Sequence, residues 1–497
     1  MRVFPLNNKT HFKSHIMNRR RFLLNNSKVA LGMTLIPAAS FSMKDEINIK
    51  KFKSNRPLLS ERTFTSEAVE KTINKVKASI ADPELAWMFE NCYPNTLDTT
   101  VDYEILDGKP DSFIITGDID AMWIRDSTAQ VWPYMSLINK DSKIKNLILG
   151  LINRQVKCIL TDPYANAFFK DLTRISKWSS DTPTPKPGVH ERKWEIDSLC
   201  YFVRLSYHYY KVSGDSSFMD SDWDKAVRLV VDTFRTEQRK DGKSPYSFTR
   251  EDAFVVGLAI FKGTGAPTKA TGMIHSIFRP SDDGTILPYL IPSNIFAYVS
   301  LAQLSELYNV NGKDNDFSNT CMSFSKEVKS AIEKYAIREH LDFGKIYAYE
   351  VDGFGNALFM DDANVPSLMS LAYIGGHTPS NIIYKNTRSF LLSDSNPYFL
   401  RGAAAEGQAS PHTGKENIWP MGIILRGLTS EDDNEISKCL QMLKATHADT
   451  GFMHESFHKD DPANFSRSWF AWANTLFGEF VIKIYNERPW ILKSNFS

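Results

Sequence analysis

Apolar side chains recur at helical spacing along most of the chain after residue 60. The pattern predicts helices over residues 66–80, 126–138, 143–160, 194–211, 222–239, 293–309, 317–336, 365–375, 380–391, 417–427, 431–446 and 468–486. Only two short stretches, 246–261 and 346–354, favour strands. Because strands and helices do not alternate as a parallel α/β fold requires, the sequence predicts an all-α protein with short β excursions in its loops.

The connections before every second predicted helix are rich in Gly, Pro, Asp, Arg and Trp. The other connections are shorter and contain fewer of these residues. These six loops cover residues 117–125, 186–194, 279–292, 352–364, 401–416 and 449–467. In a toroid of alternating outer and inner helices, every outer-to-inner connection reaches the same rim. The pattern therefore predicts an (α/α)₆ barrel whose six loops converge on one pocket, with two unrelated helical domains as the alternative.

Composition argues against a protein that binds nucleic acid or membranes and against one built on a zinc framework or a disulfide scaffold. The chain has 497 residues, 42% of them hydrophobic and 24% charged, which is typical of a globular protein with a sizeable core. The chain has 59 Lys and Arg residues and 58 Asp and Glu residues, so its net charge is close to zero. No overall electrostatic field would attract nucleic acid or an anionic membrane, and neither is expected as a partner. The five cysteines form no C-x-x-C pair, which argues against a zinc framework or a disulfide scaffold.

The first forty residues have the features of an export signal. Three arginines at positions 19–21 precede a short apolar stretch from Val29 to Ala39, and small residues follow. The Arg-Arg-x-Phe-Leu run resembles a twin-arginine signal, and a basic tail is the alternative. We expect an export signal over residues 1–42, a linker over 43–64 and a catalytic domain over 65–490. The expected location is the bacterial periplasm, without stable membrane association after removal of the signal.

The densest polar and aromatic cluster lies just before the second predicted helix. Arg125 and Asp126 can each hold two adjacent sugar hydroxyls, and Trp123 offers an apolar face for a sugar ring. Asp118 and Asp120 are further candidates, either for binding sugar or for holding a metal. Asp126 could instead cap the helix that follows.

A second cluster combines Arg279 with the adjacent acids Asp282 and Asp283 on a turn bounded by Pro and Gly. Burial at a pocket wall can raise the pKa of a carboxyl group, which suits proton donation to a leaving oxygen. An ordinary solvated turn is the alternative. The segments 190–198, 361–367 and 419–421 open other helices and could either cap them or line a pocket; the substrate-binding candidates there are Asp362, Asn364 and Trp419.

The last loop contains His454-Glu455-x-x-His458, which matches the zincin pattern of two zinc ligands and a general base. Glu479 could serve as a distant third ligand. That pattern requires a continuous helix, but Gly451 lies just before it and Pro462 shortly after it. We therefore expect neither a metal nor another cofactor here, and count His454 as a substrate-binding candidate.

Five segments taken together resemble glycoside hydrolase family 125: G-D-I-D-A-M-W-I-R-D-S, F-R-P-S-D-D, Y-L-I-P-S-N, D-D-A-N-V-P-S-L and G-F-M-H-E-S-F. The family comprises inverting, metal-independent exo-α-1,6-mannosidases with an (α/α)₆ barrel, and the resemblance spans about residues 65 to 486. It implies that Glu455 is the general base and that Asp282, rather than Asp283, is the general acid. It also implies that Trp123, Arg125 and Asp126 contact the terminal mannose.

The sequence thus leaves three functions open. The resemblance favours an exo-mannosidase that acts on α-1,6-linked mannoside oligosaccharides, and two carboxyl groups on facing loops are what glycoside hydrolysis requires. The alternatives are a zinc metallopeptidase that uses His454, Glu455 and His458, and a sugar-binding protein without catalysis.

Overall fold

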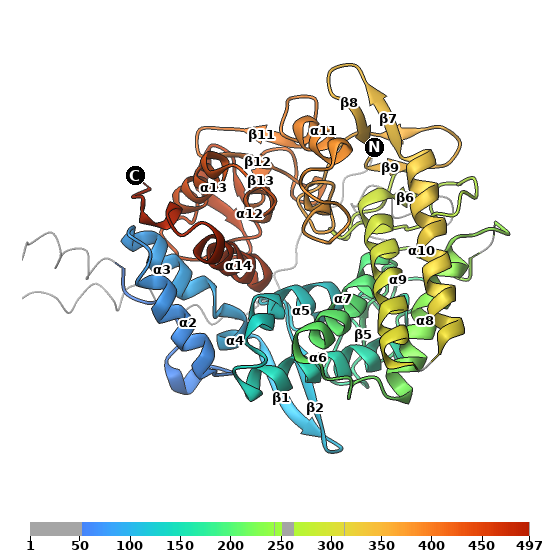
Figure 1. Cartoon of the computed structure of the whole chain (residues 1–497), viewed down its shortest axis with the longest axis horizontal. Coiled ribbons are helices and arrows are strands. Elements are labelled where there is room, and N and C mark those ends of the chain that lie inside the picture. Colours follow the sequence, from blue (N-terminus) through green and yellow to red (C-terminus); the bar gives the residue numbers. More distant parts are fainter. Residues whose placement is uncertain (1–51, 243, 251–262, 313, 497) are drawn as a thin grey trace, which may run out of the picture. The chain divides into compact units, whose positions relative to one another are not determined.

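The computed structural model describes residues 52–242, 244–250, 263–312 and 314–496. In this part of the chain, six outer helices alternate along the sequence with six inner segments (Figure 1). The outer helices are α3 (Pro83–Cys92), α6 (Ser142–Thr161), α8 (Ser221–Glu237), α10 (Asn315–Tyr335), α11 (Ile382–Leu391) and α13 (Asp433–Ala445). The inner segments are α5 (Ile124–Val131), α7 (Ile196–Ser213), α9 (Ile291–Asn311), the 3₁₀ turn η5 (Met369–Leu371), α12 (Pro420–Leu428) and α14 (Ala471–Glu487).

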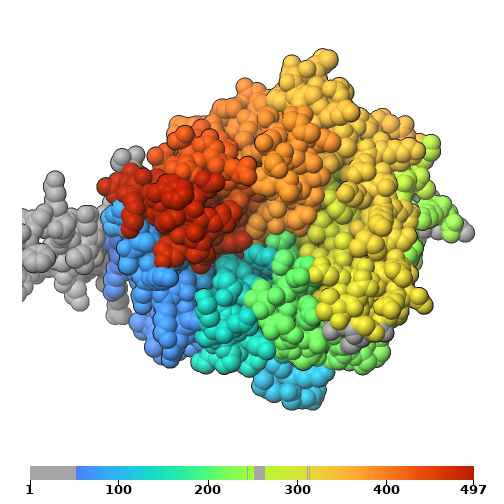
Figure 2. Space-filling model, viewed as in Figure 1, coloured from blue at the N-terminus to red at the C-terminus, as the bar shows by residue number. Residues whose placement is uncertain are grey.

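The inner segments form a closed ring. Each one contacts the next in chain order, and α14 returns to contact α5. The outer helices α3 and α13 also pack against each other, so the first and last parts of the described chain meet; Figure 2 shows the red C-terminal segments against the blue N-terminal ones. This is the predicted (α/α)₆ architecture.

Burial explains why the helices divide into two rings. Every residue of α5 is buried, and α9 is largely buried around its whole circumference, because an inner helix is covered on all sides. The outer helix α8 instead buries only one face, which includes Trp223, Val227 and Val230. The helical spacing of apolar and polar residues in the sequence is therefore clearest in the outer helices.

The remaining helices precede the ring or extend it. They are η2 (Leu59–Glu61), α2 (Glu67–Lys77), α4 (Asn95–Thr99), η3 (Trp132–Leu137), η6 (Pro411–Thr413) and η7 (Ile491–Lys493). Helix α3 was not predicted, because its buried Trp87, Met88, Phe89 and Cys92 leave no clear polar stripe. Among the described residues, no helix has both the length and the apolar character needed to cross a membrane.

The predicted helix over 365–375 is wrong in extent, because only the three residues of η5 are helical there. Pro366 disfavours a helical backbone at Val365, the residue before it, and Gly375, with a φ of 84°, cannot continue a right-handed helix. The buried carboxylate of Asp361 accepts hydrogen bonds from the backbone N–H groups of Leu368 and Met369, at 2.8 and 3.0 Å. The Asp361 carboxylate thus accepts hydrogen bonds from N–H groups that would bond to backbone carbonyls in a longer helix.

Short antiparallel sheets join the loops at the rim of the ring. Three sheets have three strands each: β3-β4-β5 (Met122–Trp123, Ala167–Phe168, Val189–Glu191), β10-β9-β6 (Ala357–Leu358, Glu350–Val351, Tyr289–Leu290) and β13-β14-β15 (Asn417–Ile418, Ser456–His458, Asp461–Ser466). Three more pairs are β1-β2 (Val101–Leu106, Lys109–Ile114), β7-β8 (Ile337–His340, Gly344–Tyr347) and β11-β12 (Phe399–Arg401, Glu406–Gln408). Each three-stranded sheet ties together two successive outer-to-inner loops, which fixes them relative to each other.

The two stretches expected to form strands differ in outcome. Strands β8 and β9 lie within or beside the stretch 346–354, as predicted. In the stretch 246–261, Thr249 pairs with Thr182 in an isolated bridge, and residues 251–261 lie outside the described residues. The expected export signal over 1–42 also lies outside them.

Candidate active site

The outer-to-inner loops meet at a pocket of about 210 Å³. It is lined by Thr116, Ile119, Trp123, Arg125, Asp126, Pro280, Ser281, Asp282, Asn364, His412, Trp419, Glu455, Arg467, Phe470 and Trp472. Five of the six loops predicted to converge contribute to this lining, and the loop before α7 lies directly behind it. A wider groove of about 770 Å³ between α2 and the start of α6 is flanked by exposed lysines, so the clustered carboxylates single out the smaller pocket.

Arg125, in the first turn of α5, is the centre of a buried charge network. Its Nη1 lies 2.6 Å from Glu195 Oε2 and 3.5 Å from Asp197 Oδ2, and its Nε lies 3.6 Å from Asp126 Oδ2. Glu195 and Asp197 flank the start of α7, in a segment that the sequence singled out without identifying these two acids. A single guanidinium thus faces three buried carboxylates.

Asp282 lines the pocket from the turn before α9, in a left-handed backbone conformation with a φ of 68°. Its Oδ1 accepts a hydrogen bond from Asn166 Nδ2 at 3.0 Å and lies 3.9 Å from Lys193 Nζ. Burial pushes the pKa of Asp282 upward, but Lys193, Arg125 and a hydrogen bond from Glu195 outweigh burial and hold the pKa below its ordinary value. Burial thus acts in the expected direction, but the net shift leaves this carboxyl group with a lowered and not a raised pKa.

Asp283 belongs to a different environment. Its Oδ1 lies 3.1 Å from His412 Nδ1, and the residue does not line the pocket. Burial lowers the pKa of His412, but Asp283, Asp282 and Glu455 together raise it to about 9. His412 therefore brings a positive charge to the pocket at neutral pH, which sequence reasoning missed because its loop carries no recognisable motif.

Glu455 lines the pocket from the loop before α14. Its Oε2 accepts a hydrogen bond from Ser466 Oγ at 2.9 Å, and its Oε1 lies 3.3 Å from Arg467 Nη1. Arg467 in turn donates from Nε to Asp118 at 3.0 Å. Asp118 thus lies outside the lining and holds the arginine that contacts Glu455.

Several pocket atoms have no hydrogen-bond partner within the protein. They include Trp123 Nε1, Arg125 Nε and Asp126 Oδ2, all buried. Buried polar atoms are nearly always satisfied, so these groups are suited to a polar ligand with several hydroxyl groups. Trp419 is oriented by its own hydrogen bond, from Nε1 to Thr413 Oγ1 at 2.7 Å.

The remaining candidates lie outside the lining. Asp120 is exposed and pairs with Arg174 at 2.6 Å. Arg279 is buried and pairs with Glu350 at 2.7 Å. Asp362 accepts hydrogen bonds from the backbone and side chain of Asn364, the residue that does reach the pocket.

The H-E-x-x-H segment does not form a zincin site. It runs through a turn into strand β14, so His454 and His458 do not share a helix face. The His454 ring stacks on Phe465 with 3.6 Å between ring centroids, and its Nε2 lies 3.4 Å from the backbone carbonyl of His447. The metallopeptidase alternative therefore fails on geometry.

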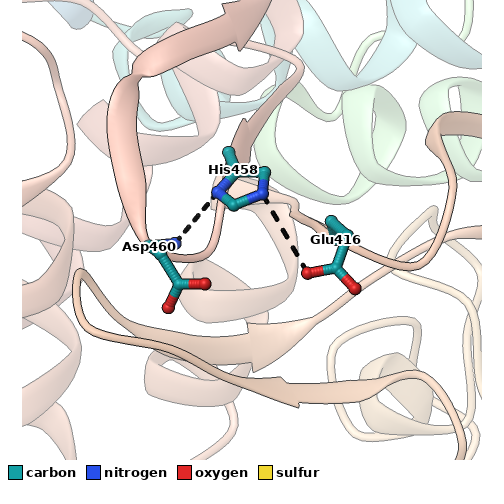
Figure 3. Close-up of side chains that lie close together, drawn as sticks. All are labelled: Glu416, His458 and Asp460. Carbon is teal, nitrogen blue, oxygen red and sulfur yellow. Dashed lines mark hydrogen bonds and ion pairs between the residues drawn. The ribbon is translucent and has the colours of Figure 1, made fainter.

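His458 instead lies beside Glu416 and Asp460, which is the single group of possible metal ligands found in the described part of the chain (Figure 3). Its Nδ1 accepts a hydrogen bond from the Asp460 backbone N–H at 3.2 Å. The Lys459 ammonium pairs with both Glu416 and Asp460. The two carboxylates thus already have a cationic partner, and all three side chains lie outside the pocket.

Two comparisons cover most of the chain. The "Meiotically up-regulated gene 157 protein" of Schizosaccharomyces pombe is 42% identical over 463 residues, which is 89% of this chain and 90% of that protein. The crystal structure of a bacterial glucoamylase complexed with acarbose matches with a TM-score of 0.52 at 12% identity, over 85% of this chain and 59% of that one. The second likeness shows the fold alone.

The fission yeast relative corrects one expectation. Location in a bacterial periplasm through a twin-arginine-like signal is wrong, because a protein so similar over nearly its whole length belongs to a eukaryote. A basic segment followed by a short apolar stretch is a general pattern and does not identify a compartment by itself.

Two further comparisons agree on a family. A Streptococcus pneumoniae protein, described as one of a family of metal-independent α-mannosidases and solved in a non-productive complex with α-1,6-mannobiose, is 40% identical with a TM-score of 0.81. The match covers 86% of this chain and 100% of that one. The family described as "Metal-independent alpha-mannosidase (GH125)" matches residues 82–482. The chain therefore belongs to glycoside hydrolase family 125, the metal-independent α-mannosidases.

Proposed function

We propose that the protein is an exo-acting α-mannosidase that releases terminal mannose from α-1,6-linked mannosides. The observation that carries this proposal is the placement of Asp282 and Glu455 in one pocket with Trp123, Arg125 and Asp126. The Streptococcus pneumoniae relative was solved with α-1,6-mannobiose, which supports this linkage as the first to test.

The size of the pocket supports exo action. A volume of about 210 Å³ suits one hexose ring rather than an internal stretch of a glycan. Trp123 Nε1 and Asp126 Oδ2, which have no hydrogen-bond partner within the protein, would provide a donor and an acceptor for the hydroxyls of that ring. The rest of the glycan would extend towards solvent.

We propose that hydrolysis proceeds with inversion and uses two carboxyl groups. Asp282 donates a proton to the glycosidic oxygen as the bond from C1 to that oxygen breaks. Glu455, held by Ser466 and Arg467, removes a proton from a water molecule that attacks C1 from the opposite face. An inverting pair leaves room for this water, so the carboxyl groups should lie roughly 6.5–9.5 Å apart.

Incubation with α-1,6-mannobiose, followed by proton NMR of the fresh product, tests both parts of the proposal. We expect mannose to appear first as the β anomer. Initial release of the α anomer would contradict inversion. Binding without any turnover would instead support the sugar-binding alternative. Parallel incubations with α-1,2- and α-1,3-mannobiose define the linkage.

We also propose that residues 65–490 make up the catalytic domain. The support is that the inner and outer rings both fall within this range. Residues just before it contact the same unit: Arg56 pairs with Glu70 at 2.6 Å and with Asp98 at 2.7 Å. Removal of residues 1–64 should therefore lower the melting temperature more than removal of residues 1–51.

A further inference from the structure

Glu195 lies directly behind the pocket and is linked to Asp282. A single amide nitrogen, Asn166 Nδ2, donates to Glu195 Oε1 at 3.2 Å and to Asp282 Oδ1 at 3.0 Å. The two carboxyl groups also lie close enough to each other to hydrogen-bond when one of them is protonated. Because ionised carboxylates are acceptors only, such a bond forms only when one of the two carries a proton.

The surrounding charges favour one proton on this pair. Glu195 is 1% exposed and Asp197 is fully buried, and both compete for the same Arg125 guanidinium. Ionising both Glu195 and Asp282 would add a further unbalanced charge to a buried group of acids, which is costly. The charged groups that face the pair from neighbouring elements are Arg125 and Asp126 of α5, Asp197 of α7, Lys193 and Glu191 before α7, Arg250, and His412 of η6.

The pKa values of the two carboxyl groups shift in opposite directions, which favours Glu195 as the protonated partner in the free protein. Burial raises the pKa of Glu195 well above its ordinary value, despite the nearby Arg125. Lys193 and Arg125 act in the opposite sense on Asp282 and hold its pKa low. A general acid needs a proton, so Asp282 alone would be poorly prepared for its proposed role near neutral pH.

We infer that Glu195 and Asp282 hold one proton between them, and that Glu195 passes it to Asp282 when Asp282 protonates the leaving oxygen. This inference rests on the proposed function. The bond from C1 to oxygen breaks with its electron pair on the leaving oxygen. The one proton of the pair moves from Glu195 to Asp282 and from Asp282 to that oxygen, so that both carboxyl groups end ionised. Water adds to C1 and yields a proton to Glu455. The cycle closes when Glu455 releases that proton to solvent and the pair takes one up.

Glu195 is therefore a positioning residue that acts through Asp282, and Glu195→Gln tests this role. The variant keeps a hydrogen-bond donor but removes the proton that can be transferred. Its Asp282, beside Lys193 and Arg125, must then keep its own proton. In the plot of kcat/KM against pH, the fall in activity at high pH (the basic limb) should therefore move to lower pH by about one to three units. At neutral pH, kcat on α-1,6-mannobiose should fall about 100-fold or more, whereas kcat on an aryl mannoside with an acidic phenol should fall less than about tenfold.

Two further variants separate proton sharing from a structural role. Glu195→Asp retains an ionisable group and should return the basic limb towards that of the wild type, which also covers the case in which Glu195→Gln does not fold. Glu350→Gln is the matched control, because Glu350 is equally buried and pairs with the buried Arg279 at 2.7 Å without contacting Asp282. It should lower the melting temperature, leave the basic limb in place and change kcat on both substrates equally.

The inference would be overturned if Glu195→Gln kept the basic limb in place and lost activity equally on both substrates. That result would mean that Glu195 only orients Arg125. If the wild-type protein itself released no mannose from either substrate, the proposed function would fail instead. The wild-type measurement therefore distinguishes the two failures.

Discussion

At the scale of single residues, the pocket gives different environments to acids that look alike in the sequence. Asp282 and Asp283 are neighbours, but Asp282 reaches the pocket beside Lys193, while Asp283 turns to His412. Glu455 contacts a hydroxyl and a guanidinium, which hold its side chain at the pocket wall. These contacts lead to two predictions about the proposed roles.

Replacing the proposed base should affect every substrate. Glu455→Gln removes the group that activates water, a step that is needed whatever the leaving group. We expect kcat to fall by about 10²–10⁴-fold or more on both mannobiose and aryl mannosides. Steady-state kinetics with both substrates checks this, with an unchanged melting temperature as evidence of folding. A substantial residual rate on aryl mannosides alone would exclude Glu455 as the base.

Replacing the proposed acid should depend on the leaving group. Asp282→Asn should lower kcat on α-1,6-mannobiose by about 10²–10⁴-fold, but much less on aryl mannosides whose phenols need little protonation. Asp283→Asn is the matched control and should show no such dependence, because Asp283 is paired with His412 outside the lining. If only Asp283→Asn showed the leaving-group dependence, the acid would be Asp283.

At the scale of elements, the site depends on how tightly neighbouring inner helices pack. Helices α12 and α14 contact each other, and Gly427 provides the space for the Phe480 ring. A Cβ at position 427 would lie 2.3 Å from Phe480 Cζ. The small sheets then hold the loops that these helices carry: β13, which precedes α12, pairs with β14, which begins one residue after Glu455.

Gly427→Ala should therefore destabilise the protein through overpacking. We expect a loss of about 1–3 kcal/mol in the free energy of unfolding, because the ring or the helix must shift. Thermal or denaturant unfolding measures the loss. Gln441→Ala, at an exposed position of α13, is the control and should change stability by no more than about 0.5 kcal/mol. Equal stability of the two variants would show that α12 and α14 can separate without cost.

At the scale of the whole molecule, the chemistry is organised around charged side chains from separate loops. Arg125 of α5, Lys193 before α7 and His412 of η6 pair with carboxylates from other segments. Arg467 pairs with Glu455 of its own loop. The group of possible metal ligands around His458 lies apart from this pocket and is already paired with Lys459. Catalysis should therefore not depend on a bound metal.

Dialysis against a strong chelator tests this expectation. The rate on α-1,6-mannobiose and the melting temperature should both remain unchanged, because no described contact in the pocket requires a metal to hold its carboxylates apart. Elemental analysis before and after dialysis is the control. Loss of stoichiometric zinc together with activity would contradict the expectation.

The sequence by itself determined the helical elements and the order of the six loops that converge. Helix formation depends on local spacing of apolar side chains, and this signal is strong wherever one face of a helix remains polar. It failed for α3, which has no clear polar stripe, and for residues 365–375, where Asp361 replaces the backbone partners. The acids Asp282 and Glu455 were identified by motif resemblance, and their roles stay predictions.

Only the tertiary structure decided how the charges pair. Asn166, Glu195 and Asp282 are up to 116 positions apart in the chain, yet a single amide joins both carboxyl groups. No local pattern encodes such a contact, because the loops are brought together by the closed ring of inner helices. The pKa of a carboxyl group depends on burial and on charges within a few ångströms, so the low pKa of Asp282 and the high pKa of Glu195 follow from the fold and not from their motifs.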